Sequence, residues 1–331
     1  MKIKTISAFV AAVAAAALFS SCGGGNKPAV ESAPYESPAP EFSADSAYRY
    51  VAEQCEFGPR TMNSEAHDKC GDYIAAKFES FGATVKSQYA DLMLYDGTPV
   101  KARNIMASYN LDKQKRILIC AHWDSRPWAD HDRNQENHRK PIDGANDGAS
   151  GVGVMLEMAR LIQLKSPNVG VDFVCFDAED SGLPEWEGES AESDTTWCLG
   201  SRYWAKQAKA SGYTARYGIL LDMVGGNNTV FYKEGFSMHW APTIVDKVWA
   251  AAYRIGMNDY LVNETGGYIT DDHGPVSQIA RIPCIDLIGS DRISHGFCAT
   301  WHTMNDNIKN ISKNVLKAAG QTVAEVIYCE Q

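Results

Sequence analysis

The stretch PIDGANDGASGVGVMLEMARLI, residues 141–162, joins a run of small residues to an apolar segment. The apolar side chains recur with helical spacing, which predicts a helix over 149–164 that packs on a core. A single carboxylate, Asp147, stands just before this helix. Either Asp147 or Ser150 could cap the helix by accepting hydrogen bonds from its first free amides. Alternatively, the glycines and alanines around Asp147 allow the backbone to approach a bound ligand closely.

Apolar segments with the length of buried strands lie on both sides of this helix. Helical patterns separate them, and such alternation predicts a largely parallel sheet covered on both faces. The expected fold class is therefore α/β, a three-layer α/β/α sandwich with a mixed, largely parallel central sheet. The strands are RILICA (116–121), VDFVCF (171–176), YGILLDM (217–223) and IPCIDLI (282–288). The other helices are expected over 43–56, 66–81, 199–211, 240–255 and 313–328.

A hairpin is predicted at one edge of the sheet. Segments 84–94 and 100–108 interrupt their apolar residues with polar ones, as half-exposed strands do. The dipeptide Asp96-Gly97 between them is typical of tight hairpin turns.

The composition is that of an ordinary globular protein. The chain has 331 residues, of which 45% are hydrophobic and 22% are charged, and it shows no internal repeat. We therefore expect one large domain over 42–331. Lysine and arginine number 31 against 41 aspartate and glutamate residues, which gives a net charge of −10. No basic cluster is present, and this argues against a nucleic-acid partner.

The N-terminus has the pattern of an export signal. MKIKTISAFVAAVAAAALFSSC places two lysines before an apolar stretch that is too short to span a membrane as a mature helix. Residues 1–21 resemble a bacterial lipoprotein signal, with Cys22 as the lipid-modified first residue of the mature chain; ordinary cleavage near Ser21 is the alternative. Residues 22–41 are rich in glycine, proline and serine and are expected to form a flexible tether. We therefore expect export to the periplasm and attachment to a membrane through the lipid.

The other cysteines show neither a CxxC pair nor zinc-finger spacing. Cys120, Cys175 and Cys284 lie in strand-like segments and are expected to be buried free thiols. Cys55 and Cys70, in the first two predicted helices, could form a disulfide in an oxidising compartment.

Ionisable side chains gather where the predicted strands end. Open α/β sheets bind ligands in the crevice outside the carboxyl ends of their strands. So many carboxylates at one edge would repel one another unless they shared a cation. Asp147 is therefore predicted to be a metal ligand rather than a helix cap. The ionisable residues at this edge are His122, Asp124, Asp147, Glu179, Asp180, Asp222 and His302.

Six motifs, in this order along the chain, resemble those of the zinc aminopeptidase superfamily, and within it those of the bacterial glutaminyl cyclases (glutaminyl-peptide cyclotransferases). The similarity extends from Phe57-Gly58-Pro59-Arg60 to the C-terminus. It implies a fold of the zinc aminopeptidase type and an acyltransferase activity that depends on zinc. The motifs are HWDS (122–125), DGANDGAS (143–150), FDAED (176–180), LLDMVG (220–225), ITDDH (269–273) and WHT (301–303).

This resemblance assigns one catalytic zinc ion to Asp147, Asp180 and His302. Two carboxylate oxygens and one imidazole leave a fourth position for water or substrate, as a catalytic zinc requires. Glu179 matches the carboxylate that moves protons. The animal cyclases have glutamate at the position of Asp180, so the shorter side chain here must be offset by the position of the backbone.

Two positions distinguish the cyclases from the aminopeptidases of this superfamily. Asp271 opens an Asp-Asp-His sequence where the peptidases have Ser-Asp-His, and the cyclases use this aspartate in a hydrogen-bond network. Trp301, directly before His302, lines the substrate pocket of the cyclases. His122 and Asp222 do not discriminate, because two-zinc peptidases use them for a second metal and cyclases retain them without one.

The implied reaction cyclises an N-terminal glutamine of a peptide or protein to pyroglutamate and releases ammonia. Glu179 would transfer the proton, while Asp271 and Asp222 would hold the proton and the developing charge. Asp222 could instead serve only to support His122. Two alternatives stay open: a two-metal aminopeptidase, and a tethered binding module with an inactive site. We expect the protein to be a monomer.

Three other features are left without a catalytic assignment. Trp186 lies near the position of a second pocket tryptophan of the cyclases, but the loop lengths do not align. His273 is expected to form structural hydrogen bonds rather than to bind metal. The polar segment 123–143 could be a lid over the site or a simply solvated loop.

Overall fold

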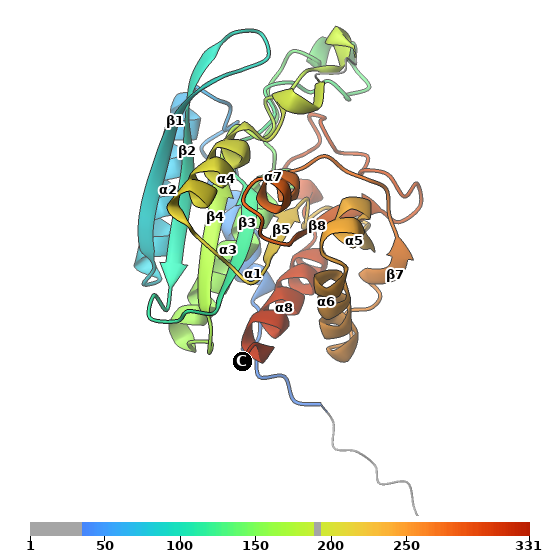
Figure 1. Cartoon of the computed structure of the whole chain (residues 1–331). Helices are drawn as coiled ribbons and strands as arrows, with labels where there is room; N and C mark the ends of the chain where they lie inside the picture. The colour runs from blue at the N-terminus through green and yellow to red at the C-terminus, as the bar shows by residue number, and fades with distance from the viewer. Residues whose placement is uncertain (1–34, 189–192) are drawn as a thin grey trace, which may run out of the picture. The chain divides into compact units, whose positions relative to one another are not determined.

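Eight strands form one mixed sheet in the computed structural model, which describes residues 35–188 and 193–331 (Figure 1). In chain order the strands are β1 (Thr84–Met93), β2 (Pro99–Tyr109), β3 (Arg116–His122), β4 (Gly170–Phe176), β5 (Gly218–Asp222), β6 (Thr229–Lys233), β7 (Leu261–Thr265) and β8 (Cys284–Asp291). Across the sheet they lie in the order β1-β2-β4-β3-β5-β8-β6-β7.

The four central strands of this order, β4, β3, β5 and β8, are parallel to one another. Antiparallel pairs flank them, β2 with β4 on one side and β6 with β8 on the other. The predicted α/β class with a largely parallel centre is therefore confirmed. The predicted hairpin is β1 and β2, and its turn holds Gly97 at φ +82°, a conformation that glycine adopts without strain.

Helices cover both faces of the sheet. They are α1 (Ala44–Cys55), α2 (Glu65–Ser80), α3 (Ala149–Leu164), α4 (Leu199–Ser211), α5 (Gly235–Trp240), α6 (Pro242–Arg254), α7 (His273–Gln278) and α8 (Lys313–Cys329). Helices α1, α3 and α8 pack together on one face, while α4 and α7 pack on the other (Figure 1). This is the expected three-layer sandwich.

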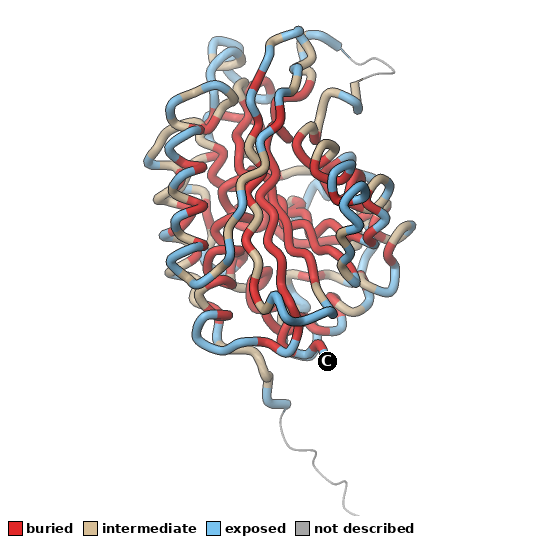
Figure 2. Tube along the Cα trace, turned by 60° about the vertical axis from the view of Figure 1, so that its left-hand side comes forward, coloured by how far each residue is buried: buried red, intermediate tan, exposed pale blue. Residues whose placement is uncertain are grey.

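Strand β3 shows how the sheet supplies both cores. Ile117 and Ile119 face the layer that contains α3, whereas Leu118 and Cys120 face the layer that contains α4. Successive side chains of a strand point to opposite faces, so a strand covered on both sides is apolar throughout. Figure 2 shows the central strands as buried and the outer sides of the helices as exposed.

Four short elements, β6, β7, α5 and α7, are absent from the sequence prediction. Helices α5 and α7 have six residues each, too few for a periodic pattern to show. Strand β7 buries Leu261 but exposes its last three residues, so no apolar run marks it. The helix predicted over 240–255 begins at Pro242, which suits the first helical position, and α5 precedes it.

The predicted signal peptide, residues 1–21, and Cys22 lie outside the described residues, as does most of the segment 22–41. Export of the protein, cleavage of its signal peptide and lipid attachment at Cys22 therefore stay predictions from the sequence. Among the helices of the described residues, none combines the length and apolarity needed to cross a bilayer.

The compact domain begins at Tyr35, seven residues before the predicted start at residue 42. The hydroxyls of Tyr35 and Ser37 both donate hydrogen bonds to the carboxylate of Glu325 in α8. The amide of Phe42 donates to the side chain of Gln321, one turn earlier in the same helix, at 2.8 Å. The last residues of the predicted tether thus contact α8.

All eight cysteines of the described residues are free thiols. Cys55 and Cys70 are therefore not joined, and the disulfide considered for them is absent. Cys120, Cys175 and Cys284 are buried, as expected from their strands.

Candidate functional site

Ionisable side chains meet at the carboxyl ends of the parallel strands, as the sequence predicts. His122 ends β3, Asp222 ends β5, and Glu179 and Asp180 follow β4. His302 lies in the loop after β8. None of these residues is more than 8% exposed. Their charges therefore interact with little screening by water.

Glycines bring the backbone before α3 close to the site. Gly144 and Gly148 have φ angles of +57° and +97°. A Cβ atom at Gly148 would lie 2.5 Å from the carbonyl oxygen of Asp124, so this position has no room for a side chain. The carboxylate of Asp147 does not cap α3, and the hydroxyl of Ser150 donates to a backbone carbonyl instead. The small residues thus give Asp147 its place at the site.

Two buried carboxylates hold the loops that carry the site. Asp306 accepts hydrogen bonds from the amide of Asp147 at 3.0 Å and from the preceding amide at 2.7 Å. Asp124 accepts from the amides of Glu179 and Asp180, both at 3.1 Å. The side chains of the site are therefore positioned through their own backbone.

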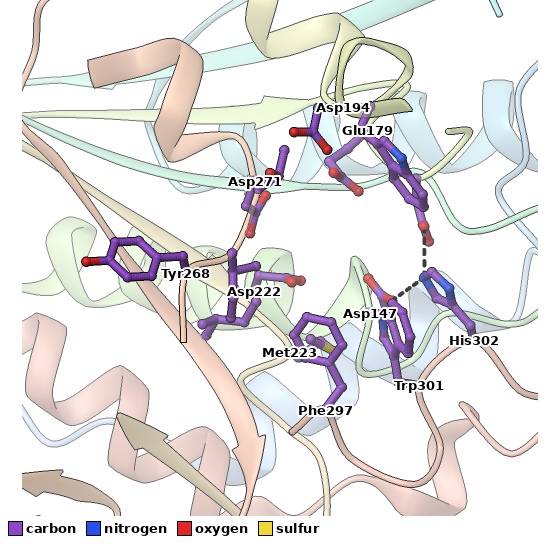
Figure 3. Close-up of a pocket in the computed structure, with 15 residues that line it drawn as sticks. Asp147, Glu179, Asp194, Asp222, Met223, Tyr268, Asp271, Phe297, Trp301 and His302 are labelled. Carbon is purple, nitrogen blue, oxygen red and sulfur yellow. Dashed lines mark ion pairs between the residues drawn. The ribbon is translucent and has the colours of Figure 1, made fainter. Parts of the chain in front are cut away.

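Asp147, Asp180 and His302 form a group that fits a metal ion. Their ligand atoms all lie within 4.8 Å of one another. Nε2 of His302 is 3.2 Å from Oδ1 of Asp180 and 3.5 Å from Oδ2 of Asp147 (Figure 3). Oδ2 of Asp180 is buried without a hydrogen-bond partner, which is costly unless it binds a cation. Two carboxylates and one imidazole are a ligand set that suits catalytic zinc.

Arg126 and Asp130 support this group, and the sequence prediction missed them. Oδ1 of Asp130 lies 3.5 Å from Nδ1 of His302, where a carboxylate fixes the orientation of a metal-binding imidazole. The Arg126 guanidinium donates to Asp130 at 2.9 Å and to the carbonyl oxygen of Asp180 at 3.1 Å. Both side chains are buried, so this part of the segment 123–143 is packed rather than solvated.

A second group shares Asp147 with the first. Nε2 of His122 is 3.0 Å from Oδ1 of Asp147 and 3.2 Å from Oδ1 of Asp222. The ligand atoms of these three residues also lie within 4.8 Å of one another. The two carboxylate oxygens of Asp147 therefore contact different histidines: Oδ1 lies next to His122 and Oδ2 next to His302.

Glu179 and Asp271 lie close together beside these groups, with carboxylate oxygens within 4.8 Å of each other. Burial raises the pKa of the Glu179 carboxyl well above its usual range; the charge of Asp271 adds to this effect, and His122 opposes it. Burial and the charge of Asp222 raise the pKa of Asp271 to about 7. The Cys198 thiol donates a hydrogen bond to Oε1 of Glu179 at 3.2 Å. Carboxyl groups tuned toward neutrality can accept and return protons at physiological pH.

These residues surround a cavity of about 260 Å³. Figure 3 shows the carboxylates of Asp147, Glu179, Asp222 and Asp271 around one open space. Trp301 lines the cavity as predicted, and its ring stacks on that of His302 at a centroid distance of 3.8 Å. The apolar part of the lining is completed by Trp197, Met223, Tyr268, Ile269, Ile288 and Phe297.

Trp197 is a second indole at the cavity, and the sequence prediction missed it. Its ring is nearly parallel to that of His302, at 6.2 Å and 6°, and the Arg126 guanidinium lies 4.6 Å from its centre. Trp186 is not among the lining residues and packs instead against Trp128, at 5.9 Å. The sequence signal for Trp197 was its position two residues before the helix α4, in the connection that follows β4.

His273 lies behind the cavity. It is fully buried, and its Nε2 is 3.2 Å from Oε2 of Glu234. Glu234 also accepts a hydrogen bond from the amide of Ile269 at 3.0 Å. The pair thus packs beneath the loop that leads to Asp271. Neither ring nitrogen of His273 has a hydrogen-bond partner among the described residues, so the structural hydrogen bonds expected of it stay a prediction.

Comparison with known proteins identifies the family. Residues 104–327 match Peptidase family M28. The chain is 27% identical over 285 residues to Aminopeptidase YwaD of Bacillus subtilis (strain 168), a match that covers 82% of this chain and 54% of that protein. The chain thus spans about half the length of this curated relative. Other curated relatives are described as probable zinc metalloproteases, so zinc is the metal that the family implies.

Solved structures cover nearly the whole domain. The Bacteroides thetaiotaomicron glutaminyl cyclase bound to N-acetylhistamine is 54% identical with a TM-score of 0.86, over 88% of this chain and 100% of that chain. A leucine aminopeptidase precursor from Bacteroides thetaiotaomicron VPI-5482 is 53% identical with a TM-score of 0.86, over 89% and 100%. With these matches and the site geometry, the chain belongs to peptidase family M28, in the branch that contains the bacterial glutaminyl cyclases.

Proposed function

We propose that this protein is a glutaminyl-peptide cyclotransferase, which converts the N-terminal glutamine of peptides or proteins to pyroglutamate and releases ammonia. One observation carries the proposal: Glu179 and Asp271 form a pair of buried carboxyls, with raised pKa values, on the wall of an indole-lined cavity beside Asp147 and His302. The relative with 54% identity is a glutaminyl cyclase.

Cyclisation needs proton transfer and a curled substrate. The α-amine attacks the γ-carbonyl carbon, a C–N bond forms, and the bond to the side-chain amide nitrogen breaks. The α-ammonium loses two of its three protons: Glu179 passes one to solvent and the other to the leaving nitrogen, which departs as ammonia, while the third stays on the lactam nitrogen. Asp271 and Asp222, on the same cavity wall, hold the ammonium near Glu179. Trp301 packs on the glutamine methylenes and excludes water, which favours the attack geometry over hydrolysis.

We propose one zinc ion, held by Asp147, Asp180 and His302. Zinc bound there would supply a Lewis acid that polarises the γ-carbonyl. The chain's contribution is a fixed ligand geometry: Asp130 orients the His302 ring, and Asp124 holds the amide of Asp180.

A two-metal aminopeptidase is the second candidate. The group of His122, Asp147 and Asp222 favours it, because its ligand atoms converge as closely as those of the first group. Asp271 weighs against it, since a carboxylate at this position supports proton transfer within the substrate.

Mass spectrometry of the peptide Gln-Gly-Gly, incubated with the purified protein and zinc, separates the candidates. A cyclotransferase removes one ammonia and leaves the peptide otherwise intact, faster than the blank. Release of free glutamine would show an aminopeptidase and overturn the proposal. An unchanged peptide, with zinc bound and the fold intact, would favour a binding module.

Replacement of Trp197 by alanine is expected to raise KM roughly tenfold and to change kcat less. The indole offers apolar surface to the substrate before and during the reaction, so its loss weakens uniform binding. Trp186→Ala is the matched control, because this indole lies in the same connection after β4 but does not line the cavity. Equal KM values for the two variants would contradict the role given to Trp197.

Cys198 is expected to position the general base. Cys198→Ala removes the thiol that donates to Glu179, and kcat should fall roughly tenfold with KM within about twofold. Cys198→Ser keeps a donor at this place and should recover most of the loss. Steady-state kinetics of both variants test this; equal impairment would mean that the cysteine acts only through packing.

We also propose that the enzyme works outside the cytoplasm, held at a membrane by lipid on Cys22. The signal-like pattern of residues 1–21 supports this. Metabolic labelling with a fatty acid, compared with Cys22→Ser, tests it: the variant should carry no label.

A further inference from the structure

A second cavity, of about 200 Å³, adjoins the first. The two share three lining side chains, Ile269, Ile288 and Phe297, so one layer of apolar residues forms a wall of both. The same loops also carry catalytic-site residues, since Ile269 leads to Asp271 and Phe297 leads to Trp301. A substrate held in the first cavity is therefore next to the second.

The second cavity is built for an apolar side chain. Its floor comes from paired strands, Tyr232 in β6 and Ser290 in β8, both buried. The ring of His295 stacks on Tyr232 at 4.9 Å and 19° and forms one wall. Gly267 also lines the cavity, and a Cβ atom there would meet nothing within 4 Å, so the space beside this residue is free.

The one carboxylate among the lining residues is already engaged. Glu234 accepts hydrogen bonds from the amides of Phe236 and Ser237, at 2.8 and 2.6 Å, and from the amide of Ile269. Neither lysine nor arginine is found among the lining residues. An acidic side chain would therefore meet a carboxylate and neither lysine nor arginine, whereas an aromatic ring would find aromatic and aliphatic contacts.

We propose that this cavity binds the side chain of the residue that follows the N-terminal glutamine, and that it selects aromatic or large aliphatic residues. The inference rests on the proposed cyclotransferase function and specifies its substrates. Consecutive Cα atoms are only about 3.8 Å apart, so the second residue of the peptide is the one that lies beside the shared wall.

Four tripeptides test the position and the chemistry: Gln-Phe-Gly, Gln-Gly-Phe, Gln-Glu-Gly and Gln-Gly-Gly. We expect kcat/KM for Gln-Phe-Gly to exceed that for Gln-Gly-Gly about tenfold or more, from burial of the ring. Gln-Glu-Gly should have the lowest kcat/KM of the four peptides. An equal or larger gain for Gln-Gly-Phe, or no gain for either, would overturn the proposal. Cyclisation of Gln-Gly-Gly reports separately on the proposed function.

Two variants locate the effect. Ser290→Leu fills the floor, and His295→Asn removes the aromatic wall while it tolerates the φ of +61° at this position. Each should lower kcat/KM for Gln-Phe-Gly roughly three- to tenfold and leave Gln-Gly-Gly within about twofold. His239→Asn, an exposed histidine of α5, is the matched control. Unchanged selectivity in His295→Asn would overturn the assignment, even if Ser290→Leu failed to fold.

Discussion

Glu179→Gln is expected to lower kcat about 10²- to 10⁴-fold while the protein keeps its zinc. Glutamine has the shape of glutamate and can still accept the hydrogen bond of the Cys198 thiol, so the fold and cavity should persist. It cannot take a proton from the α-ammonium. Steady-state cyclisation of Gln-Gly-Gly, with zinc content measured on the same samples, gives the comparison.

The pH dependence provides the second test of this role. Because the folded protein raises the pKa of the Glu179 carboxyl, its basic form disappears as the pH falls through a value above the ordinary one of about 4.3. The wild-type rate should therefore decline on the acid side at higher pH than a free glutamate would cause. Glu187→Gln, an exposed residue of the same connection, should behave as wild type. A variant Glu179→Gln with wild-type rate and bound zinc would exclude the proton transfer.

His302→Ala is expected to lose both zinc and activity, down to the level of the blank. The variant leaves the carboxylates of Asp147 and Asp180 without the imidazole between them, and two carboxylates alone form a poor zinc site. Elemental analysis after dialysis gives the zinc content, and cyclisation gives the activity.

A chelator separates loss of metal from loss of fold. Wild type stripped of zinc should be inactive and should recover when zinc is restored, whereas His302→Ala should not recover. Circular dichroism checks that the variant is folded, and His239→Ala serves as a control with a distant exposed histidine. Full activity of the stripped wild type would contradict the metal requirement.

The central part of the fold could be predicted because its signal is local. Four apolar strands of five to eight residues alternate with long helices, and each reads as buried on both faces. Strands β6 and β7 and the short helices α5 and α7 could not be predicted in this way. They depend on partners that lie elsewhere in the chain, such as the antiparallel pairing of Val230 with Ser290.

The residues of the site also fall into two groups, those that local sequence motifs indicate and those that only the fold brings to the site. Asp147, Glu179 and His302 stand at strand or helix ends inside recognisable motifs, so the sequence indicates them and the structure brings them together. Arg126 and Trp197 lie outside these motifs. Their part in the site arises from a buried guanidinium that links two connections across the edge of the sheet, a relation that spacing along the chain does not encode.

The position of Asp147 between two imidazoles has a consequence for how the protein takes up metal. One carboxylate serves both groups, so an ion beside His302 draws on the same charge that an ion beside His122 would need. Two cations on either side of one carboxylate also repel each other. If an ion were bound at each position, each would weaken the binding of the other, so a first zinc ion would bind more tightly than a second. The zinc content of a purified sample would then depend on the free zinc concentration of its buffer.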